Sequence, residues 1–287
     1  GRGTRPWSGV GRRLGSSDET DGMQILTPDN APWILLSGAA AGFLGSVLGV
    51  GGGIILVPLL VLVFGVPIHL AIGTSIMTVI ATSSMAGTFN LERGTVNIRL
   101  GMLLEVATAV GALFGGVVAG AIRGPVLTVI FGAILPPIAA LMWRKGHERP
   151  GRGGPPSESD YRMRRLPVAM ALSLAAGTIS GLLGIGGGII KVPALTVFCN
   201  VPARVAAATS TFMIGVTAVA SAFLYFGRGQ VRPALTGVVI LGVLGGSALG
   251  TQVHQRLRSH QIIRLFALLV AFAAAQMLYR GIRGTLE

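Results

Sequence analysis

Charged residues are scarce in this chain of 287 residues. They make up 11% of it, and hydrophobic residues make up 51%, whereas about 25% of an average soluble domain is charged. This composition excludes an ordinary soluble enzyme. Basic residues still outnumber acidic ones by 23 to 10, for a formal charge of +13. The positions of these charges therefore decide between a nucleic-acid-binding protein and a membrane protein.

Cysteine and metal-ligand patterns are nearly absent as well. Cys199 is the only cysteine, which excludes a disulfide within the chain and a cysteine-rich metal site. The glycine-rich stretches do not complete a Gly-x-Gly-x-x-Gly nucleotide motif. The histidines have no metal-ligand spacing; they are His69, His147, His254 and His260. The sequence predicts no metal, nucleotide or other cofactor.

Most of the chain consists of long apolar runs. They cover residues 33–64, 70–90, 100–122, 125–143, 167–199, 205–226, 233–253 and 262–279. Among the charged residues, only Glu105, Lys191 and Arg264 fall inside them. A helix needs roughly 17 to 25 apolar residues to cross a membrane, and the runs lack the alternation of membrane-spanning strands. We expect an all-α, polytopic helical protein of the cell membrane, with about eight transmembrane helices, whose partner is the lipid bilayer and not nucleic acid.

The two halves of the chain repeat each other. Residues Gly49–Pro58 recur as Gly184–Pro193, at an offset of 135 (184 − 49), and further matches follow at the same offset. This predicts two homologous four-segment repeats. The expected organisation is a disordered tail at 1–30, a first repeat at 33–143, a basic linker at 144–166 and a second repeat at 167–281.

The first run of each repeat is too long for one straight crossing. Residues 33–64 would extend about 48 Å as a helix, because each residue adds about 1.5 Å. Glycine adopts positive φ freely, and a proline follows each glycine triplet, at Pro58 and Pro193. We expect the first helix of each repeat to break at these triplets, which are Gly51, Gly52 and Gly53, and Gly186, Gly187 and Gly188. Paired broken helices mark the binding sites of secondary transporters.

The basic residues indicate how the chain crosses the membrane. If each long run crosses once, the repeats are parallel, and the tail, the linker and the C-terminus share a side with 17 basic residues against 5. If each run folds back as a re-entrant hairpin, the split is 13 against 9. The positive-inside rule favours the larger difference. Parallel repeats are therefore expected, with both termini and the linker in the cytoplasm.

The glycine breaks are the first candidate site. A broken helix presents unpaired N–H groups and the positive end of its dipole, which suits an anion. The alternative is close helix packing, which small residues at this spacing also promote. Triple glycines at the same place in both repeats favour the anion site.

Two charged residues inside the apolar runs are the next candidates. Lys191 lies three residues after Gly188, where an ammonium is expensive and usually functional, and the matching residue of the first repeat is Leu56. We expect Lys191 to bind an anion. The alternatives are snorkelling to the membrane surface and an ion pair with Glu105. Glu105 is interpreted either as a coupling carboxylate that takes up protons or as a residue near the lipid headgroups.

Two pairs of hydroxyl residues complete the candidate site. Thr74 and Ser75 recur at the repeat offset as Thr209 and Ser210, near the start of the second run of each repeat. Their hydroxyls can bind ligand oxygens or donate back to their own helix, as is common in membrane helices. Because both pairs recur, we favour ligand binding.

These motifs resemble the TauE/SafE family of sulfite exporters. The resemblance rests on Gly-x-Gly-Gly-Gly-Ile-Ile-x-Val-Pro, the Val-Pro that follows it, the Thr-Ser pair and an Arg-Gly in both halves, and spans about residues 33–280. It implies a permease, not an enzyme, for small sulfur-containing anions such as sulfite, sulfonates, sulfoacetate or thiosulfate. The driving force would be an ion gradient, with H⁺ or Na⁺ as the coupling ion. The resemblance covers the glycines and the Thr-Ser pairs, whereas Lys191 and Glu105 lie outside its motif.

Other functions stay open at this point. One is a permease or channel for another small anion or metabolite. A cation path is disfavoured, since Glu105 is the only acidic residue in the apolar runs. A remote alternative is an intramembrane serine protease, with Ser75 as the nucleophile and His254 as its base. The oligomeric state is not predicted, and a homodimer is one option.

Overall fold

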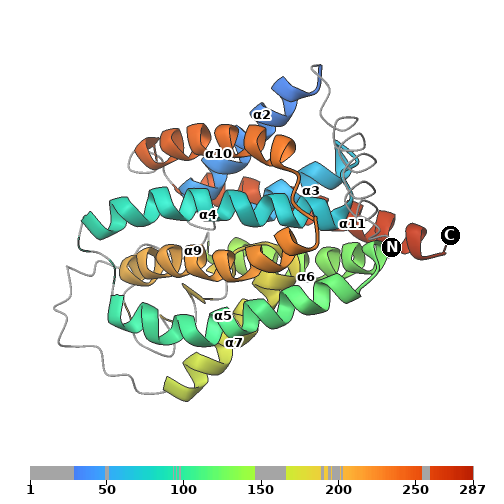
Figure 1. Ribbon diagram of the computed structural model, residues 1–287. Coiled ribbons are helices and arrows are strands. Elements are labelled where there is room, and N and C mark those ends of the chain that lie inside the picture. Colours follow the sequence, from blue (N-terminus) through green and yellow to red (C-terminus); the bar gives the residue numbers. More distant parts are fainter. Residues whose placement is uncertain are drawn as a thin grey trace, which may run out of the picture.

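The protein is a bundle of helices. The computed structural model describes residues 29–48, 52–92, 94, 96, 98–145, 166–188, 191, 192, 195, 201, 203–253 and 259–286. In this part of the chain the regular structure is helical, as predicted (Figure 1). The helices are α2 (Ala31–Leu48), α3 (Gly53–Leu62), α4 (Ile68–Glu92), α5 (Ile98–Ala121), α6 (Gly124–Lys145), α7 (Leu166–Leu183), α9 (Ala203–Gly227), α10 (Pro233–Val253) and α11 (Ser259–Leu286). Gly51, most of the predicted tail and most of the predicted linker lie outside the described residues.

The helices recur in the same order at the same spacing. The starts of α7, α9, α10 and α11 follow those of α2, α4, α5 and α6 by 135 residues, because 166 − 31, 203 − 68, 233 − 98 and 259 − 124 all give this offset. Gly53, which begins α3, corresponds to Gly188, which is helical together with Lys191, Val192 and Leu195. Each repeat therefore has five segments, since its first apolar run forms two of them.

Four of the described helices are long and apolar enough to cross a membrane. Their spans are Ile68–Thr88, Ile98–Ala121, Val205–Gly227 and Pro233–Gly250, which belong to α4, α5, α9 and α10. These are two pairs of repeat counterparts. Large apolar side chains remain exposed on their outer faces, as at Phe114, Phe223 and Leu241. A polytopic helical membrane protein has this pattern because its outer face contacts lipid.

Glycines bring the first helix of each repeat against the other repeat. On α10, a Cβ at Gly246 or Gly250 would overlap the carbonyls of Ala39 or Phe43 on α2. The equivalent glycines of α5, Gly111 and Gly115, meet the carbonyls of Leu174 and Thr178 on α7 in the same way. Since later residues meet later residues, both helix pairs are parallel. The two repeats are thus interlocked, as small residues at membrane helix interfaces allow.

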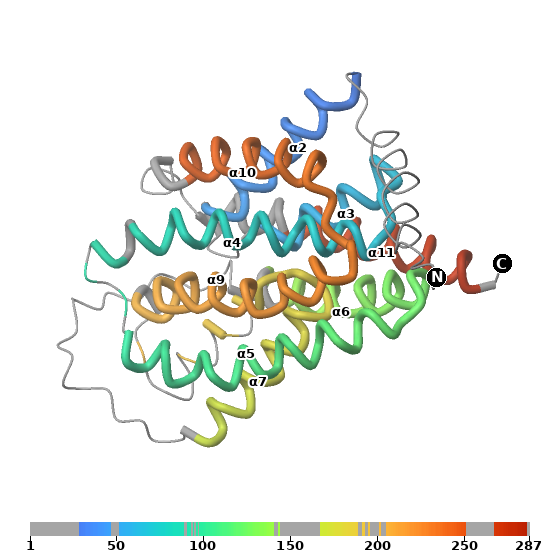
Figure 2. The backbone as a smooth tube through the Cα atoms, viewed as in Figure 1, coloured from blue at the N-terminus to red at the C-terminus, as the bar shows by residue number. Residues whose placement is uncertain are grey.

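Repeat counterparts that pair with each other run in opposite directions. On α6, Gly132 faces Ala274 and Leu278 of α11, whereas Gly281 of α11 faces Pro125 and Val129. These two helices are therefore antiparallel. Figures 1 and 2 show the same relation for α4 and α9, which lie side by side in the middle of the bundle. Counterparts that pair antiparallel are related by a twofold axis across the helices, so the repeats are inverted.

The inversion follows from the break in the first run. A hollow of about 370 Å³ is lined by Asn30, Trp33 and Ser37 at the start of α2 and by Val63 and Phe64 just after α3. The start of α2 and the end of α3 therefore lie together, as they do in a hairpin. Arg280, near the end of α11, donates to the carbonyl of Val61 at 3.2 Å. We call this the termini end, and we call the opposite end, where α6 ends and α7 begins, the linker end.

The expected parallel arrangement is wrong. It assumed that each long run crosses once, which would place the tail, the linker and the C-terminus on one side. In the structure α2 and α3 form a re-entrant pair, so each repeat reverses the direction of the chain (Figure 2). Lys145, at the end of α6, consequently lies at the opposite end from the start of α2 and the end of α11. The charge tally misled because 7 of the 17 basic residues belong to the linker.

Candidate functional site

The helix breaks occur at the predicted glycines. Gly52 precedes α3 with a φ of 73°, and Gly184, Gly186 and Gly187 have φ values of 67°, 86° and 66°. Side chains are strained in this left-handed region, whereas glycine is not. The new helices begin directly after these turns, because Leu56 N donates to Gly52 O at 3.2 Å and Lys191 N to Gly187 O at 3.1 Å. The first N–H groups of each new helix have no partner within it.

The two breaks meet each other in the interior. A Cβ on Gly53 would lie 2.5 Å from the carbonyl oxygen of Gly184 and 2.8 Å from Ser75 Oγ. A Cβ on Gly186 would lie 2.9 Å from Ile214 of α9 and 3.3 Å from Val79 of α4. Only glycine permits this approach. The start of α3 and the second break therefore lie together between the central helices α4 and α9.

The predicted hydroxyl residues are buried around these breaks. Ser75 Oγ donates to Gly184 O at 2.8 Å, so it connects α4 to the break of the other repeat. Thr74 Oγ1 lies 3.4 Å from Thr236 Oγ1 of α10. Thr209 is buried on α9, where its methyl group lies close to Gly101 of α5.

Ser210 differs from its counterpart Ser75. Its side chain is 0% exposed, and its Oγ has no hydrogen-bond partner in the part of the chain that the structure describes. Gly49, which corresponds to Gly184, lies outside that part. A buried hydroxyl without a partner costs about 1–3 kcal/mol. Ser210 therefore has an unused donor and acceptor close to the predicted site.

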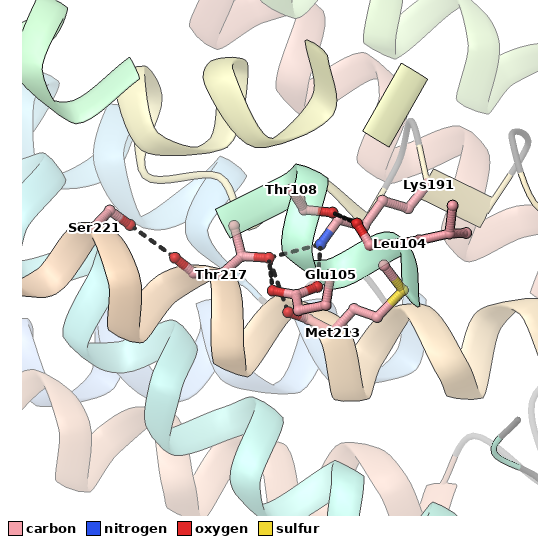
Figure 3. A network of polar contacts seen from close by, with 7 residues as sticks. All are labelled: Leu104, Glu105, Thr108, Lys191, Met213, Thr217 and Ser221. Atoms are coloured by element: carbon pink, nitrogen blue, oxygen red, sulfur yellow. Dashed lines mark hydrogen bonds and ion pairs between the residues drawn. The ribbon is translucent and has the colours of Figure 1, made fainter. Parts of the chain in front are cut away.

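Lys191 and Glu105 form an ion pair (Figure 3). Lys191 Nζ lies 3.4 Å from Glu105 Oε2, and the two side chains are 1% and 5% exposed. The structure therefore has the pairing that we considered as an alternative for Lys191. It also buries the Glu105 side chain inside the helix bundle. Whether Lys191 binds an anion remains a prediction.

Thr217 of α9 completes this cluster, and the sequence analysis missed it. Lys191 Nζ donates to Thr217 Oγ1 at 2.7 Å, and Thr217 Oγ1 donates to Glu105 Oε1 at 2.6 Å (Figure 3). A signal was present, because Thr82 and Thr217 match at the repeat offset. Thr82, however, only donates to its own helix, at Thr78 O. A matched threonine therefore does not by itself identify a functional position.

The part of the chain that the structure describes contains no other candidate centre. Within the described residues there is no group of three or more His, Cys, Asp or Glu side chains that could hold a metal ion. His69 Nε2 lies 3.2 Å from the carbonyl oxygens of Ala119 and Ile122, at the termini end. His254, the base that a serine protease would need, lies outside the described residues.

Inverted repeats with broken helices that meet in the interior are typical of membrane transporters. The comparisons identify the family. A model of the family described as "Sulfite exporter TauE/SafE" matches residues 34–277. The chain belongs to this family, and it is a membrane transporter.

Several relatives have similar length. A "Probable membrane transporter protein YunE" of Bacillus subtilis is 26% identical over 269 residues, which cover 87% of this chain and 97% of the relative. A "Probable membrane transporter protein" of Xylella fastidiosa (strain 9a5c) is 30% identical over 250 residues, covering 85% and 94%. The relative MJ0441 of Methanocaldococcus jannaschii, with the same description, is 26% identical over 241 residues, covering 79% and 87%. No solved structure matches at a significant level.

Proposed function

We propose that this transporter moves small sulfur-containing anions, such as sulfite, sulfonates, sulfoacetate or thiosulfate. The observation that carries the proposal is the meeting of the two helix breaks at Gly53 and Gly184. The N-terminus of a helix has a partial charge of about +0.5 and unpaired N–H donors. Two such ends in a water-poor interior suit an oxyanion better than a cation or a neutral solute.

The side chains around the breaks fit this ligand. Sulfite and sulfonates present several acceptor oxygens, and the hydroxyl of Ser210, which has no partner among the described residues, can donate to one of them. Thr209 lies next to Ser210 on the same turn of α9. The glycines add backbone N–H groups, and the first repeat contributes Gly52 and Gly53 through α3. We therefore assign the anion to the space between the two breaks.

Alternating access follows naturally from the inverted repeats. In the described structure the hydroxyl pairs on α4 and α9 are fully buried, with 0% exposure at Thr74, Ser75, Thr209 and Ser210. The site is therefore closed from both ends of the bundle. If the two repeats exchange conformations, the site opens first toward one end and then toward the other.

The orientation in the membrane is proposed from the charges. With inverted repeats, the linker end has 13 basic residues and the termini end has 9, of which 4 belong to the tail. The positive-inside rule places the more basic side in the cytoplasm. We therefore propose a cytoplasmic linker end, which puts both termini on the opposite side and reverses our expectation for them.

The serine protease alternative finds no support. Ser75 Oγ donates to the carbonyl of Gly184, so its proton is not directed at a base. A channel for another small anion or a metabolite would use the same buried site. It differs from a transporter in being open through both ends at once.

Transport into vesicles tests the proposal. Purified protein in liposomes is expected to accumulate labelled sulfite or a sulfonate faster than empty liposomes and to exchange it across the membrane. Ser210→Ala should weaken anion binding about 10- to 100-fold, because a hydrogen bond to a charged group contributes about 1.5–3 kcal/mol. Ser84→Ala, on an exposed face of α4, is the matched control. Folded protein that moves no sulfur anion would overturn the proposal.

A further inference from the structure

The buried cluster of Lys191, Glu105 and Thr217 lies beside only one of the two helix breaks. At the offset of 135, Lys191 and Thr217 of the second repeat correspond to Leu56 and Thr82 of the first, whereas Glu105 of the first repeat corresponds to Ile240 of the second. Leu56 is buried at 1% exposure, as Lys191 is. The same position in the fold is thus occupied by the apolar Leu56 in one repeat and by Lys191, a member of an ion pair, in the other.

This asymmetry argues that the charges are not required for folding. Removing two charges from water costs several kcal/mol for each ion, and an apolar pair of similar volume is often as stable or more so. The residues that correspond to the ion pair at the first break, Leu56 and Ile240, are both apolar. The ion pair at the second break is therefore better explained by a role in transport.

The cluster adjoins the proposed anion site. Lys191 lies in the first turn after the second break, because its N–H donates to Gly187 O at 3.1 Å. Its ammonium bridges to α9 through Thr217 and to α5 through Glu105. The ammonium of Lys191 thus connects three elements around the break: its own helical segment, α5 and α9. If Lys191 changes its partner, the packing between these three elements must change.

We propose that Glu105 is the proton-coupling site of the transporter and that Lys191 is the switch between proton and anion. This inference rests on the proposed anion transport. In the empty protein, Lys191 neutralises Glu105. An anion at the break competes for the ammonium, and Glu105 loses its partner. An unpaired buried carboxylate is too costly to persist, so Glu105 takes up a proton from the water on the side from which the anion entered.

The charge balance of this cycle is simple. A monovalent anion arrives with one negative charge, and one proton binds a carboxylate oxygen of Glu105. When the site opens to the other side, the anion leaves, the proton returns to water, and Lys191 pairs with Glu105 again. One proton and one monovalent anion therefore move together, and no net charge crosses the membrane.

Few other groups can take this proton. Glu105 lies on α5, which packs on α7 and α9. α7 has no titratable side chain. Between Val205 and Gly227 of α9 the only one is Tyr225, whose hydroxyl donates to Gly181 O at 3.0 Å, two turns beyond Thr217. Lys191 is the charged group that faces Glu105.

Infrared spectroscopy tests the proton acceptor without any substrate. In Lys191→Met, Glu105 has no cation, so the anion-free protein should gain the absorption band of a protonated carboxyl group. The double variant Lys191→Met/Glu105→Gln should lack this band, whereas Lys191→Met/Glu92→Gln should retain it, because Glu92 is exposed at the end of α4. A Lys191→Met protein without the band would overturn the proposal.

Flux measurements on the unaltered protein test the coupling and need no variant to fold. Methanesulfonate is a suitable probe, because it is the anion of a strong acid and carries no proton itself. Its uptake into liposomes, with the membrane potential held at zero, should acidify the interior by one proton per anion. Uptake without acidification would overturn the coupling and leave the proposed function intact. If no sulfur anion moves, the proposed function fails and the coupling fails with it.

Discussion

The two repeats share a backbone plan but differ at the centre of their packing. At the second break, Lys191 forms an ion pair with Glu105 of α5, and Thr217 joins them. At the first break the corresponding residues are Leu56, Ile240 and Thr82. The course of the backbone therefore depends on the glycines, which both repeats have. It accommodates either charged or apolar side chains at these positions. The comparison separates what builds the scaffold from what adds chemistry to it.

The largest effect on stability is expected from removing only one partner of the ion pair. Lys191→Leu alone should lower the free energy of unfolding by about 3–5 kcal/mol, because Glu105 would remain buried without its cation. The double variant Lys191→Leu/Glu105→Ile copies the corresponding apolar residues Leu56 and Ile240 and should recover most of this loss. The stability of both variants is measured by purifying them in a mild detergent and unfolding them with increasing amounts of a denaturing detergent. A double variant as unstable as the single one would show that the repeats are not interchangeable here.

A smaller effect is expected from the two matched threonines. Thr217→Val removes hydrogen bonds to charged groups and should cost about 1.5–3 kcal/mol. Thr82→Val removes only a bond back to Thr78 O and should cost less than about 1 kcal/mol. The same unfolding measurement compares them. Equal losses would mean that Thr217 has no special relation to the ion pair.

The interlocked helices offer a third test on neighbouring residues. A Cβ on Gly246 would overlap the backbone of Ala39 on α2, whereas a Cβ on Gly245 meets nothing within 4 Å. Gly246→Ala should therefore cost about 1–3 kcal/mol, and Gly245→Ala should stabilise α10 by about 0.5–1 kcal/mol. Gly111→Ala, the counterpart of Gly246 on α5, should behave as Gly246→Ala does. Thermal unfolding of the three variants ranks them, and a stabilising Gly246→Ala would contradict the parallel contact of α2 with α10.

The inversion itself is tested by a change that should leave stability and flux unaltered. Arg99 and Ala234 are repeat counterparts (99 + 135 = 234), and both are exposed at the starts of α5 and α10. A cysteine at each position, in a chain whose Cys199 is replaced by serine, should react with a membrane-impermeant reagent from opposite sides. If the linker end is cytoplasmic, Ala234→Cys reacts in intact cells and Arg99→Cys reacts only after permeabilisation. Labelling of both cysteines from the same side would contradict the inversion and support parallel repeats.

Much of the helical layout could be predicted from the sequence. Most apolar runs agree with the helices within about three residues, although α11 continues seven residues beyond its run (286 − 279), because long uncharged segments have few other uses in a membrane. The breaks were predictable for a similar reason, since Gly52 and Gly187 stand where a run of 32 or 33 residues must change direction. The presence of a break does not by itself determine whether the chain continues across the membrane or turns back as a hairpin. That choice depends on how α3 packs, for example at Gly53 against Gly184, and such contacts between distant segments leave no local signal.

The candidate site was predictable in its parts but not in its assembly. Lys191 and Glu105 were recognisable because charges in apolar runs are rare. Their pairing joins residues 86 positions apart, and the sequence offered snorkelling as an equal explanation. Thr217 could not be selected, since buried threonines in these helices commonly bond to their own backbone, as Thr82 and Thr108 do.

The contact between α2 and α10 also sets a constraint on how the protein is made. Ser46 of α2 donates to the carbonyl of Ser247 on α10, 201 residues later in the chain. At a synthesis rate of about 5–20 residues per second, α2 would wait roughly 10 to 40 seconds on the ribosome before its partner exists. Its glycine-lined face must meanwhile be covered by lipid or by the insertion machinery. α2 is thus synthesised long before its final neighbour, and defects in α10 should be expected to expose α2 to degradation.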